Sequence, residues 1–172
     1  NWRAASTNEG PGISRTKVAI TDNNSFRETI YGIKVVNTTS TAYNCDIAQD
    51  NVKMEDGATY TMSAYFKVIS GNPTYRLQYG TNPYPVKTGT ATSGWNKYSY
   101  TFKYDKTQFS NKLTTNIYFG FSGANFEGYI CGFKLEKGTV PECMEGYSVP
   151  QNEDEYTDFD TRFIDHIKYY TI

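Results

Sequence analysis

The sequence predicts an all-β fold, an antiparallel β-sandwich of the jelly-roll type with about eight strands and a short C-terminal helix. Two observations lead to this prediction. The 172 residues include 16 Tyr, 10 Phe and 22 Thr but only three Leu, a composition that favours strands over helices. Short segments of strand composition also recur at regular spacing between turn residues, which is typical of a sandwich or jelly roll.

The expected strands follow one another along the first four-fifths of the chain. They cover residues 16–20, 30–36, 42–48, 59–69, 75–79, 97–104, 113–121 and 129–136. Apolar side chains occupy alternate positions in three of them, which predicts one buried and one solvated face for each strand. The expected core faces are Tyr60, Met62, Ala64, Phe66 and Val68; Leu113, Ile117, Phe119 and Phe121; and Tyr129, Cys131, Phe133 and Leu135. In the second of these strands, Asn116 and Tyr118 fall on the opposite face.

The distribution of charge divides the chain after residue 141. Residues 1–141 carry 15 Lys and Arg against 10 Asp and Glu, whereas the remaining residues carry 2 against 8. We therefore expect a sandwich domain over residues 1–141, an acidic linker over 142–157 and a short helix or docking tail over 158–172.

Phe159, Phe163 and Ile167 recur at every fourth position of the tail, which predicts one apolar stripe of a short helix. A lone helix of this length is marginal in water, so it must dock on its own domain or on a partner chain. The Lys and Arg residues are scattered without a basic block, so no nucleic-acid partner is expected. No run of apolar residues approaches the length of a membrane span.

Catalytic chemistry is not expected, and we predict that the chain is not an enzyme. The single histidine, His166, lies in the tail and is expected to be solvated. A glycosidase needs two carboxylates facing each other across a groove, and the sequence does not bring candidates such as Glu127 and Glu136 together.

Metal binding is limited by the few nitrogen and sulfur ligands. Cys45, Cys131 and Cys143 form no CxxC motif or Cys/His cluster, so zinc is not expected, and a disulfide between Cys45 and Cys143 stays open. A structural calcium ion is the one cofactor left open. Its weak candidate oxygen ligands are Asp22, Asp46, Asp50 and Glu136.

The excess of aromatic residues is the more informative feature for function. Flat aromatic side chains stack on the apolar faces of sugar rings, and nearby polar groups bind the hydroxyl groups. Two groups are expected to be displayed in this way, around the loop after residue 79 and at the start of the strand 97–104. The candidate ligand-binding residues are Tyr75, Tyr79, Tyr84, Trp95 and Tyr98, with Arg76 and Gln78 on the opposite face of their strand.

Three segments resemble a known family. Residues 57–67 (GATYTMSAYFK), 94–102 (GWNKYSYTF) and 132–141 (GFKLEKGTVP) resemble the central, middle and closing strands of carbohydrate-binding-module-like jelly rolls. Such domains are found in bacteriophage tail, fibre and baseplate proteins. In order, the segments span roughly residues 16–141. The resemblance implies that Leu135 belongs to the core and that Glu136 ties down the end of the sheet.

The resemblance implies a non-catalytic domain on the virion surface that binds polysaccharide of the host cell surface. Its other partners would be virion proteins, in a homo-oligomer that forms part of a larger assembly. Many weak sites on one particle would add up to firm attachment. Two alternatives stay open: an accessory module of a secreted glycoside hydrolase, and a ligand-free decoration protein that docks through its C-terminal helix.

Overall fold

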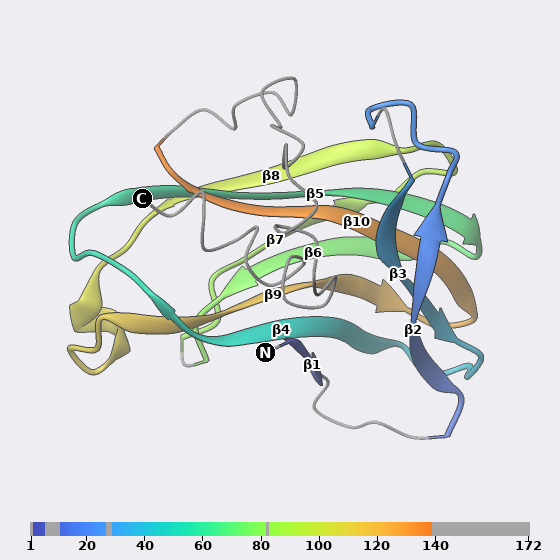
Figure 1. The fold of residues 1–172 in the computed structure, drawn as a ribbon. Helices are drawn as coiled ribbons and strands as arrows, with labels where there is room; N and C mark the ends of the chain where they lie inside the picture. Colours follow the sequence, from blue (N-terminus) through green and yellow to red (C-terminus); the bar gives the residue numbers. More distant parts are fainter. Residues whose placement is uncertain (1, 6–10, 27–28, 82, 139–172) are drawn as a thin grey trace.

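The computed structural model describes residues 2–5, 11–26, 29–81 and 83–138, and these form two antiparallel sheets packed face to face (Figure 1). Sheet A joins five strands in the order β1 (Trp2–Ala5), β4 (Tyr43–Lys53), β9 (Thr114–Gly123), β6 (Thr74–Tyr79) and β7 (Val86–Thr90). Sheet B joins β2 (Ile13–Ile20), β3 (Ile30–Asn37), β10 (Phe126–Lys137), β5 (Thr59–Ser70) and β8 (Asn96–Lys103).

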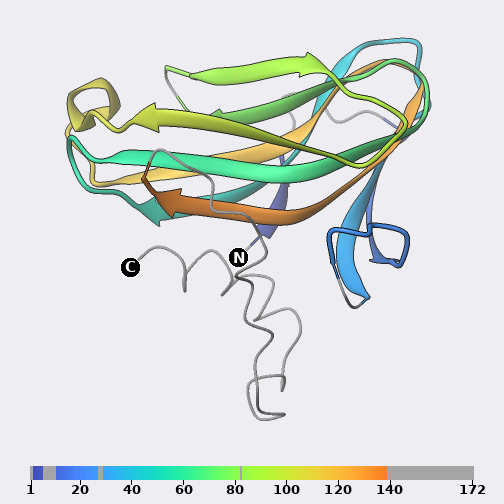
Figure 2. The ribbon, with the colours of Figure 1, turned by 90° about the horizontal axis from the view of Figure 1, so that it is seen from above.

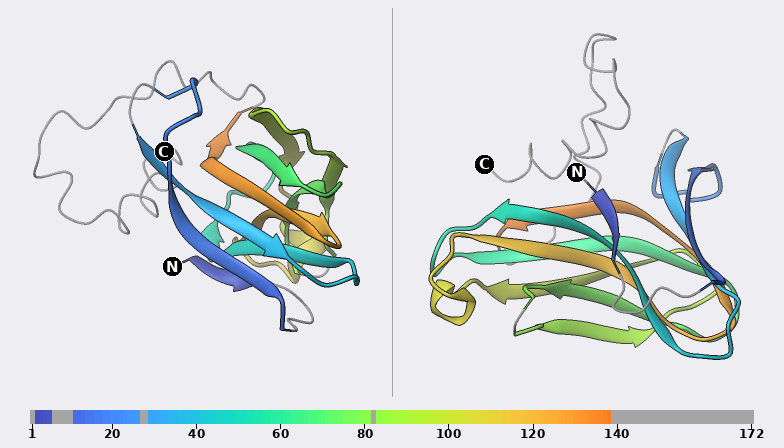
Figure 3. Two further views of the ribbon diagram at one scale, coloured as in Figure 1. Left: turned by 90° about the vertical axis from the view of Figure 1, so that its right-hand side faces the viewer. Right: turned by 90° about the horizontal axis from the view of Figure 1, so that it is seen from below.

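The described part of the chain therefore has ten strands instead of about eight, and the all-β sandwich is confirmed. The two strands that were not expected, β1 and β7, are edge strands of sheet A (Figure 3). Each is short, and its sequence lacks an apolar alternation. A 3-10 turn, η1 (Lys106–Phe109), lies between β8 and β9. None of the residues that the structure describes forms a helix long and apolar enough to cross a membrane.

Several expectations concern residues outside the described ranges. These are the acidic linker, the helix with Phe159, Phe163 and Ile167, and the residues Cys143 and His166. They stay predictions.

The core between the sheets follows the alternation expected from the sequence along β5 and from Ile117 onward in β9. Leu113, which was expected in the core, instead precedes β9 and is 52% exposed. Met62 and Phe66 of β5 face Phe119 and Phe121 of β9, and all four are fully buried. The rings of Phe66 and Phe121 meet edge to face, with centroids 5.3 Å apart, an arrangement that stabilises aromatic pairs. Leu135 is also fully buried, as the family resemblance implies.

For the last strand, the expected core face is wrong for Tyr129 and Cys131 and correct for Phe133 and Leu135. β10 contains a bulge between Cys131 and Lys134, where Gly132 has a φ of +61°. One extra residue reverses the alternation, because successive side chains of a strand point to opposite faces. Phe133 and Leu135 therefore face the core, whereas Tyr129 and Cys131 lie on the outer face of sheet B, opposite Lys67 and Tyr65 of β5.

The β2–β3 hairpin runs at a steep angle to the long strands and projects at one end of the molecule (Figures 1 and 2). β3 pairs with β10 only from Phe126 to Cys131, so this hairpin leaves the sheet where the bulge begins. Its connecting loop lies on the outer face of sheet B, because the ring of Phe26 packs edge to face on Tyr65 at 5.4 Å. The bulge thus positions the loop that carries Asp22.

Candidate functional site

Arg76 and Gln78, two of the candidate ligand-binding residues, lie on the outer face of sheet A. The register aligns Asp46 of β4, Gly120 of β9 and Arg76 of β6 in one row across the sheet. The next row contains Ala48, Tyr118 and Gln78. We call the surface formed by Asp46, Arg76, Gln78 and Tyr118 the sheet A face.

The centre of the sheet A face is an ion pair that spans a strand. Nε of Arg76 donates to Oδ1 of Asp46 at 3.2 Å, and Nη2 of Arg76 donates to Oε1 of Gln78 at 2.6 Å. The pair can close because Gly120 has no side chain: a Cβ there would lie 2.2 Å from the Asp46 carboxylate. A glycine at this position therefore creates the space that the carboxylate fills.

Burial changes the acidity of the central carboxyl. Asp46 is only 5% exposed although it lies on an outer face. Desolvation raises the pKa of Asp46 to about 6, and the nearby Arg76 and Arg15 guanidinium groups reduce that rise. Ion pairs of this kind add little to stability compared with apolar residues of the same volume.

The rim of the sheet A face is also polar. Arg3 of β1 donates to both carboxylate oxygens of Asp50, at 2.5 and 2.8 Å. Tyr118 lies between these residues and the central pair and packs with Ala5 and Ala48 in a small apolar cluster. The sheet A face and its rim thus combine one aromatic ring with guanidinium, carboxylate and amide groups from four neighbouring strands. The carboxylates and guanidinium groups balance in charge.

Three of the candidate aromatic residues are placed elsewhere than expected. Tyr75, Tyr79 and Tyr98 point between the sheets, and Tyr75 and Tyr79 are less than a tenth exposed. Tyr75 stacks on Tyr98 with centroids 3.9 Å apart, and Tyr79 stacks on Phe102 at 3.8 Å. Burial raises the pKa of Tyr79 to about 12. These rings stabilise the core and are not displayed to a ligand.

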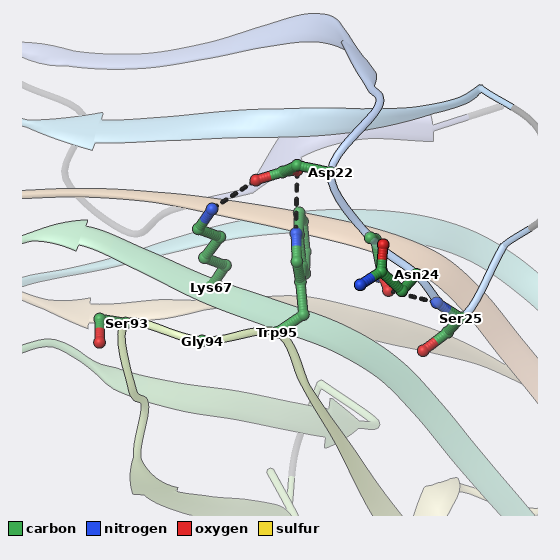
Figure 4. A pocket seen from close by; sticks show the side chains of 8 residues that line it. Asp22, Asn24, Ser25, Lys67, Ser93, Gly94 and Trp95 are labelled. Atoms are coloured by element: carbon green, nitrogen blue, oxygen red, sulfur yellow. Dashed lines mark hydrogen bonds and ion pairs between the residues drawn. The ribbon is translucent and has the colours of Figure 1, made fainter.

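Tyr84 and Trp95 lie in loops at opposite ends of β7. Among the residues that the structure describes, Tyr84 is the most exposed large hydrophobic side chain, at 61%. Trp95 instead lines a hollow of about 510 Å³ together with side chains of the β2–β3 loop and of β5 (Figure 4). We call this hollow the Trp95 pocket, and its lining residues are Asp22, Asn23, Asn24, Ser25, Lys67, Ser93, Gly94 and Trp95.

The calcium candidates do not come together. Asp22 is paired with Lys67, Asp46 with Arg76, Asp50 with Arg3, and Glu136 with Lys134. Among the residues that the structure describes, no group of three or more His, Cys, Asp or Glu side chains could hold a metal ion. The four carboxylates are thus neutralised by cationic side chains and do not form an oxygen cage.

The carboxylate pair considered for glycoside hydrolysis is separated by the length of a strand. Glu127 and Glu136 lie nine residues apart on β10, which corresponds to about 30 Å. Hydrolysis of a glycosidic bond requires carboxyl groups less than about 10 Å apart. Glu127 is paired with Lys34, and Glu136 is tied to Lys134 at 2.6 Å at the end of the sheet.

Sequence reasoning missed the roles of Arg3, Asp46, Gly120 and Tyr118 in the sheet A face. A signal was available for Tyr118, because the alternation of its strand placed it opposite the core face. The signal for Asp46 was weaker, since its partner Arg76 follows 30 residues later. Only the register of β4, β9 and β6 brings the pair together.

Comparison with known proteins shows the fold. No family model matches the chain, and no curated protein matches its sequence. Among solved structures, TmCBM61 in complex with β-1,4-galactotriose is similar with a TM-score of 0.54 and 14% identity, covering 80% of this chain and 88% of that one. The CBM22-1 xylan-binding domain of Paenibacillus barcinonensis Xyn10C is similar with a TM-score of 0.53 and 10% identity, covering 81% and 86%.

A phage protein is also similar. The enzymatically active domain of tailspike protein 4 of bacteriophage CBA120 has a TM-score of 0.54 and 13% identity. The match covers 78% of this chain but only 19% of that one. The chain therefore has the β-sandwich fold of carbohydrate-binding modules, which recurs as one segment of a larger phage protein.

Proposed function

We propose that this chain is a non-catalytic carbohydrate-binding module that holds polysaccharide on the sheet A face. The observation that carries the proposal is the buried row of Asp46 and Arg76 across Gly120, beside Tyr118 and Gln78. The row holds fixed donors and acceptors beside an aromatic ring, the combination that a sugar with apolar faces and a hydroxyl edge requires. Asp46, Gln78 and Tyr118 are each less than a tenth exposed, so a sugar would contact only their outermost atoms.

The fold supports this proposal. Several structures that share it are named as carbohydrate-binding or xylan-binding domains, or contain a bound oligosaccharide. One similar structure joins a CBM22-1 module to a GH10 module in an endo-1,4-β-D-xylanase of Clostridium thermocellum, so the accessory module of a secreted glycoside hydrolase is the context we favour. The likeness to a tailspike segment favours a second context, a domain of a phage tail or fibre that attaches to host polysaccharide.

A glycan array tests the proposal. We expect the full chain to bind a defined set of plant or bacterial polysaccharides. Gln78→Ala should weaken that binding about tenfold, because it removes a charge-assisted hydrogen bond from Arg76. Lys34→Met on the outer face of sheet B is the matched control and should leave binding within about twofold. Equal binding by Gln78→Ala and the wild type would contradict the sheet A face as the site.

The absence of catalysis is tested on the same hits. Each bound polysaccharide is incubated with the chain and new reducing ends are measured. We expect none above the background without protein. Release of reducing ends that survives purification would contradict the non-catalytic part of the proposal. Binding in the presence of EDTA should equal binding with calcium, since the calcium candidates are each paired with a cation.

A further inference from the structure

The Trp95 pocket lies on the opposite outer face of the sandwich from the sheet A face. Lys67 comes from β5 of sheet B, and the stacking partner of Trp95 is Tyr129 of β10, with centroids 6.4 Å apart. The remaining wall is the β2–β3 loop, more than 60 residues away from Trp95 in the sequence (Figure 4). A ligand in this pocket would therefore be separated from the sheet A face by the whole core.

The polar groups of the pocket are joined in one network. Nε1 of Trp95 donates to Oδ1 of Asp22 at 3.0 Å, and Nζ of Lys67 donates to Oδ2 of Asp22. Nζ of Lys67 also lies 6.0 Å from the centre of the Trp95 ring. The hydrogen bond from Lys67 holds the pKa of Asp22 below its ordinary value, so Asp22 remains an ionised acceptor.

Hydrogen bonds hold the described residues of both loops that line the pocket. In the β2–β3 loop, Asn23 is buried, and its Nδ2 donates to the Cys131 thiol at 3.6 Å while its Oδ1 accepts from the backbone N–H of Ser25. In the β7–β8 loop, Nδ2 of Asn96 donates to the Gly94 carbonyl at 3.0 Å. The backbone N–H of Val68 donates to the Thr92 carbonyl at 2.8 Å.

This anchoring matters for binding. A pocket whose walls are already ordered loses less conformational entropy when a ligand enters. Its volume of about 510 Å³ also falls within the range of small-molecule sites. The Trp95 pocket is thus large enough for a small ligand.

The lining residues define the chemistry of that ligand. Asp22 and Lys67 cancel in charge, and every other lining side chain is neutral. Asn24, Ser25 and Ser93 are exposed at the rim and offer amide and hydroxyl groups. Trp95 supplies a flat apolar surface. A neutral ring with one apolar face and several hydroxyl groups fits this combination.

We propose that the Trp95 pocket is a second, independent carbohydrate site that takes one or two neutral pyranose units. The site does not depend on the sheet A face, because no residue is shared. Two sites on opposite faces would let one domain hold a polysaccharide and a separate short glycan, or cross-link two chains, with a gain from multivalency.

Fluorescence of Trp95 tests the proposal directly. The chain has two tryptophans, Trp2 and Trp95, so a Trp2→Phe variant reports Trp95 alone. The probes are the methyl glycosides of glucose, galactose, mannose and xylose and their β-1,4-linked disaccharides. We expect saturable quenching or a spectral shift with at least one probe, in the millimolar range typical of small ligands.

Three matched variants decide the outcome, with saturation-transfer NMR as a second readout that needs no Trp2 substitution. Trp95→Ala should lower the affinity about tenfold or more. Tyr84→Ala, an exposed aromatic at the other end of β7, should stay within about twofold. The double variant Asp46→Leu with Arg76→Met, which removes the central ion pair of the sheet A face, should still bind the probes at the Trp95 pocket.

Two results would overturn the proposal. One is no response of Trp95 and no saturation transfer with any of the probes. The other is a response that disappears in the Asp46→Leu, Arg76→Met variant, because the signal would then come from the sheet A face. Array binding through the sheet A face with a silent Trp95 pocket would overturn the second site and leave the proposed function standing.

Discussion

On the sheet A face, the Asp46–Arg76 pair lies on strands that have neighbours on both sides, whereas in the Trp95 pocket Asp22 and Trp95 lie on loops. Both regions hold an aromatic ring beside an ion pair. The side chains of Asp46 and Arg76 are 7% and 11% exposed, but those of Asp22 and Lys67 are 52% and 23% exposed. Because the Asp46–Arg76 pair is buried, removing one partner should destabilise the fold strongly. Because the Asp22–Lys67 pair is more exposed, a substitution there should change stability little.

The largest difference is expected when one partner of each pair is removed. Arg76→Met leaves the Asp46 carboxylate buried without its cation and should lower the free energy of unfolding by about 4 kcal/mol at pH 7. The loss should shrink at pH 5, where Asp46 takes up a proton. Chemical denaturation measures both. The double variant Asp46→Leu, Arg76→Met should recover most of the stability, and a failure to recover would show that the pair itself stabilises the fold.

The pH dependence of Asp46 gives the next largest effect. Desolvation raises the pKa of Asp46 to about 6. Between about pH 4 and pH 6, Asp46 is therefore protonated in the folded chain but ionised in the unfolded chain. The stabilising contribution is therefore complete below about pH 4 and is lost as the pH rises through 6, by on the order of 3 kcal/mol.

The test is the difference in free energy of unfolding between the wild type and Asp46→Asn from pH 4 to pH 7. Asp22, Asp56 and Asp105 have pKa values lowered by hydrogen bonds from Lys67, Lys106 and Thr107 respectively, so they make stability rise with pH. Their contribution is the same in both proteins and cancels in the difference. We expect the wild type to lose stability relative to Asp46→Asn as the pH rises. Parallel curves would mean that Asp46 titrates normally.

Substituting a glycine in each region should give a smaller difference in the free energy of unfolding than the changes at Arg76 and Asp46. Gly120→Ala places a Cβ 2.2 Å from the Asp46 carboxylate and 2.6 Å from the Cys45 carbonyl, and should cost about 2 kcal/mol. Gly94→Ala in the Trp95 pocket is the matched control, because its nearest atom would be 3.9 Å away, and should stay within about 0.5 kcal/mol. Thermal unfolding measures both, and equal shifts in Tm would argue against the tight row on the sheet A face.

The smallest effect is expected for Asp22→Asn. The pair with Lys67 is partly exposed, so the free energy of unfolding should fall by less than about 1 kcal/mol. The same variant should weaken any ligand of the Trp95 pocket, because Asp22 also accepts from Trp95. A loss of several kcal/mol in denaturant titration would instead identify Asp22 as a structural anchor of the β2–β3 loop.

The fold could be predicted from the sequence to a large extent, because alternation marks the faces of long strands such as β5 and β9. The prediction from alternation failed at β10, where the bulge at Gly132 reverses which side chains face the core. It also failed for Tyr75, Tyr79 and Tyr98, since a hydroxyl group suggests the surface while the stacked rings fill the core. β1 and β7 were missed because edge strands need no apolar face.

The candidate sites were predictable only in pieces. Arg76, Gln78 and Trp95 were identified as candidates from their positions near turns and strands. Their partners Asp46 and Asp22 were considered only as calcium ligands, because the pairing of residues 30 and 73 positions apart depends on sheet register and on the path of a loop. The sequence shows which side chains are available in both regions, but only the fold shows which of them pair.

The most direct measurement is backbone amide chemical-shift mapping of the full chain with the strongest ligand from the glycan array. We expect shifts concentrated in β4, β6 and β9, around Asp46, Arg76 and Tyr118. Shifts confined to the outer face of sheet B, with those three strands unchanged, would contradict the sheet A face as the carbohydrate-binding surface.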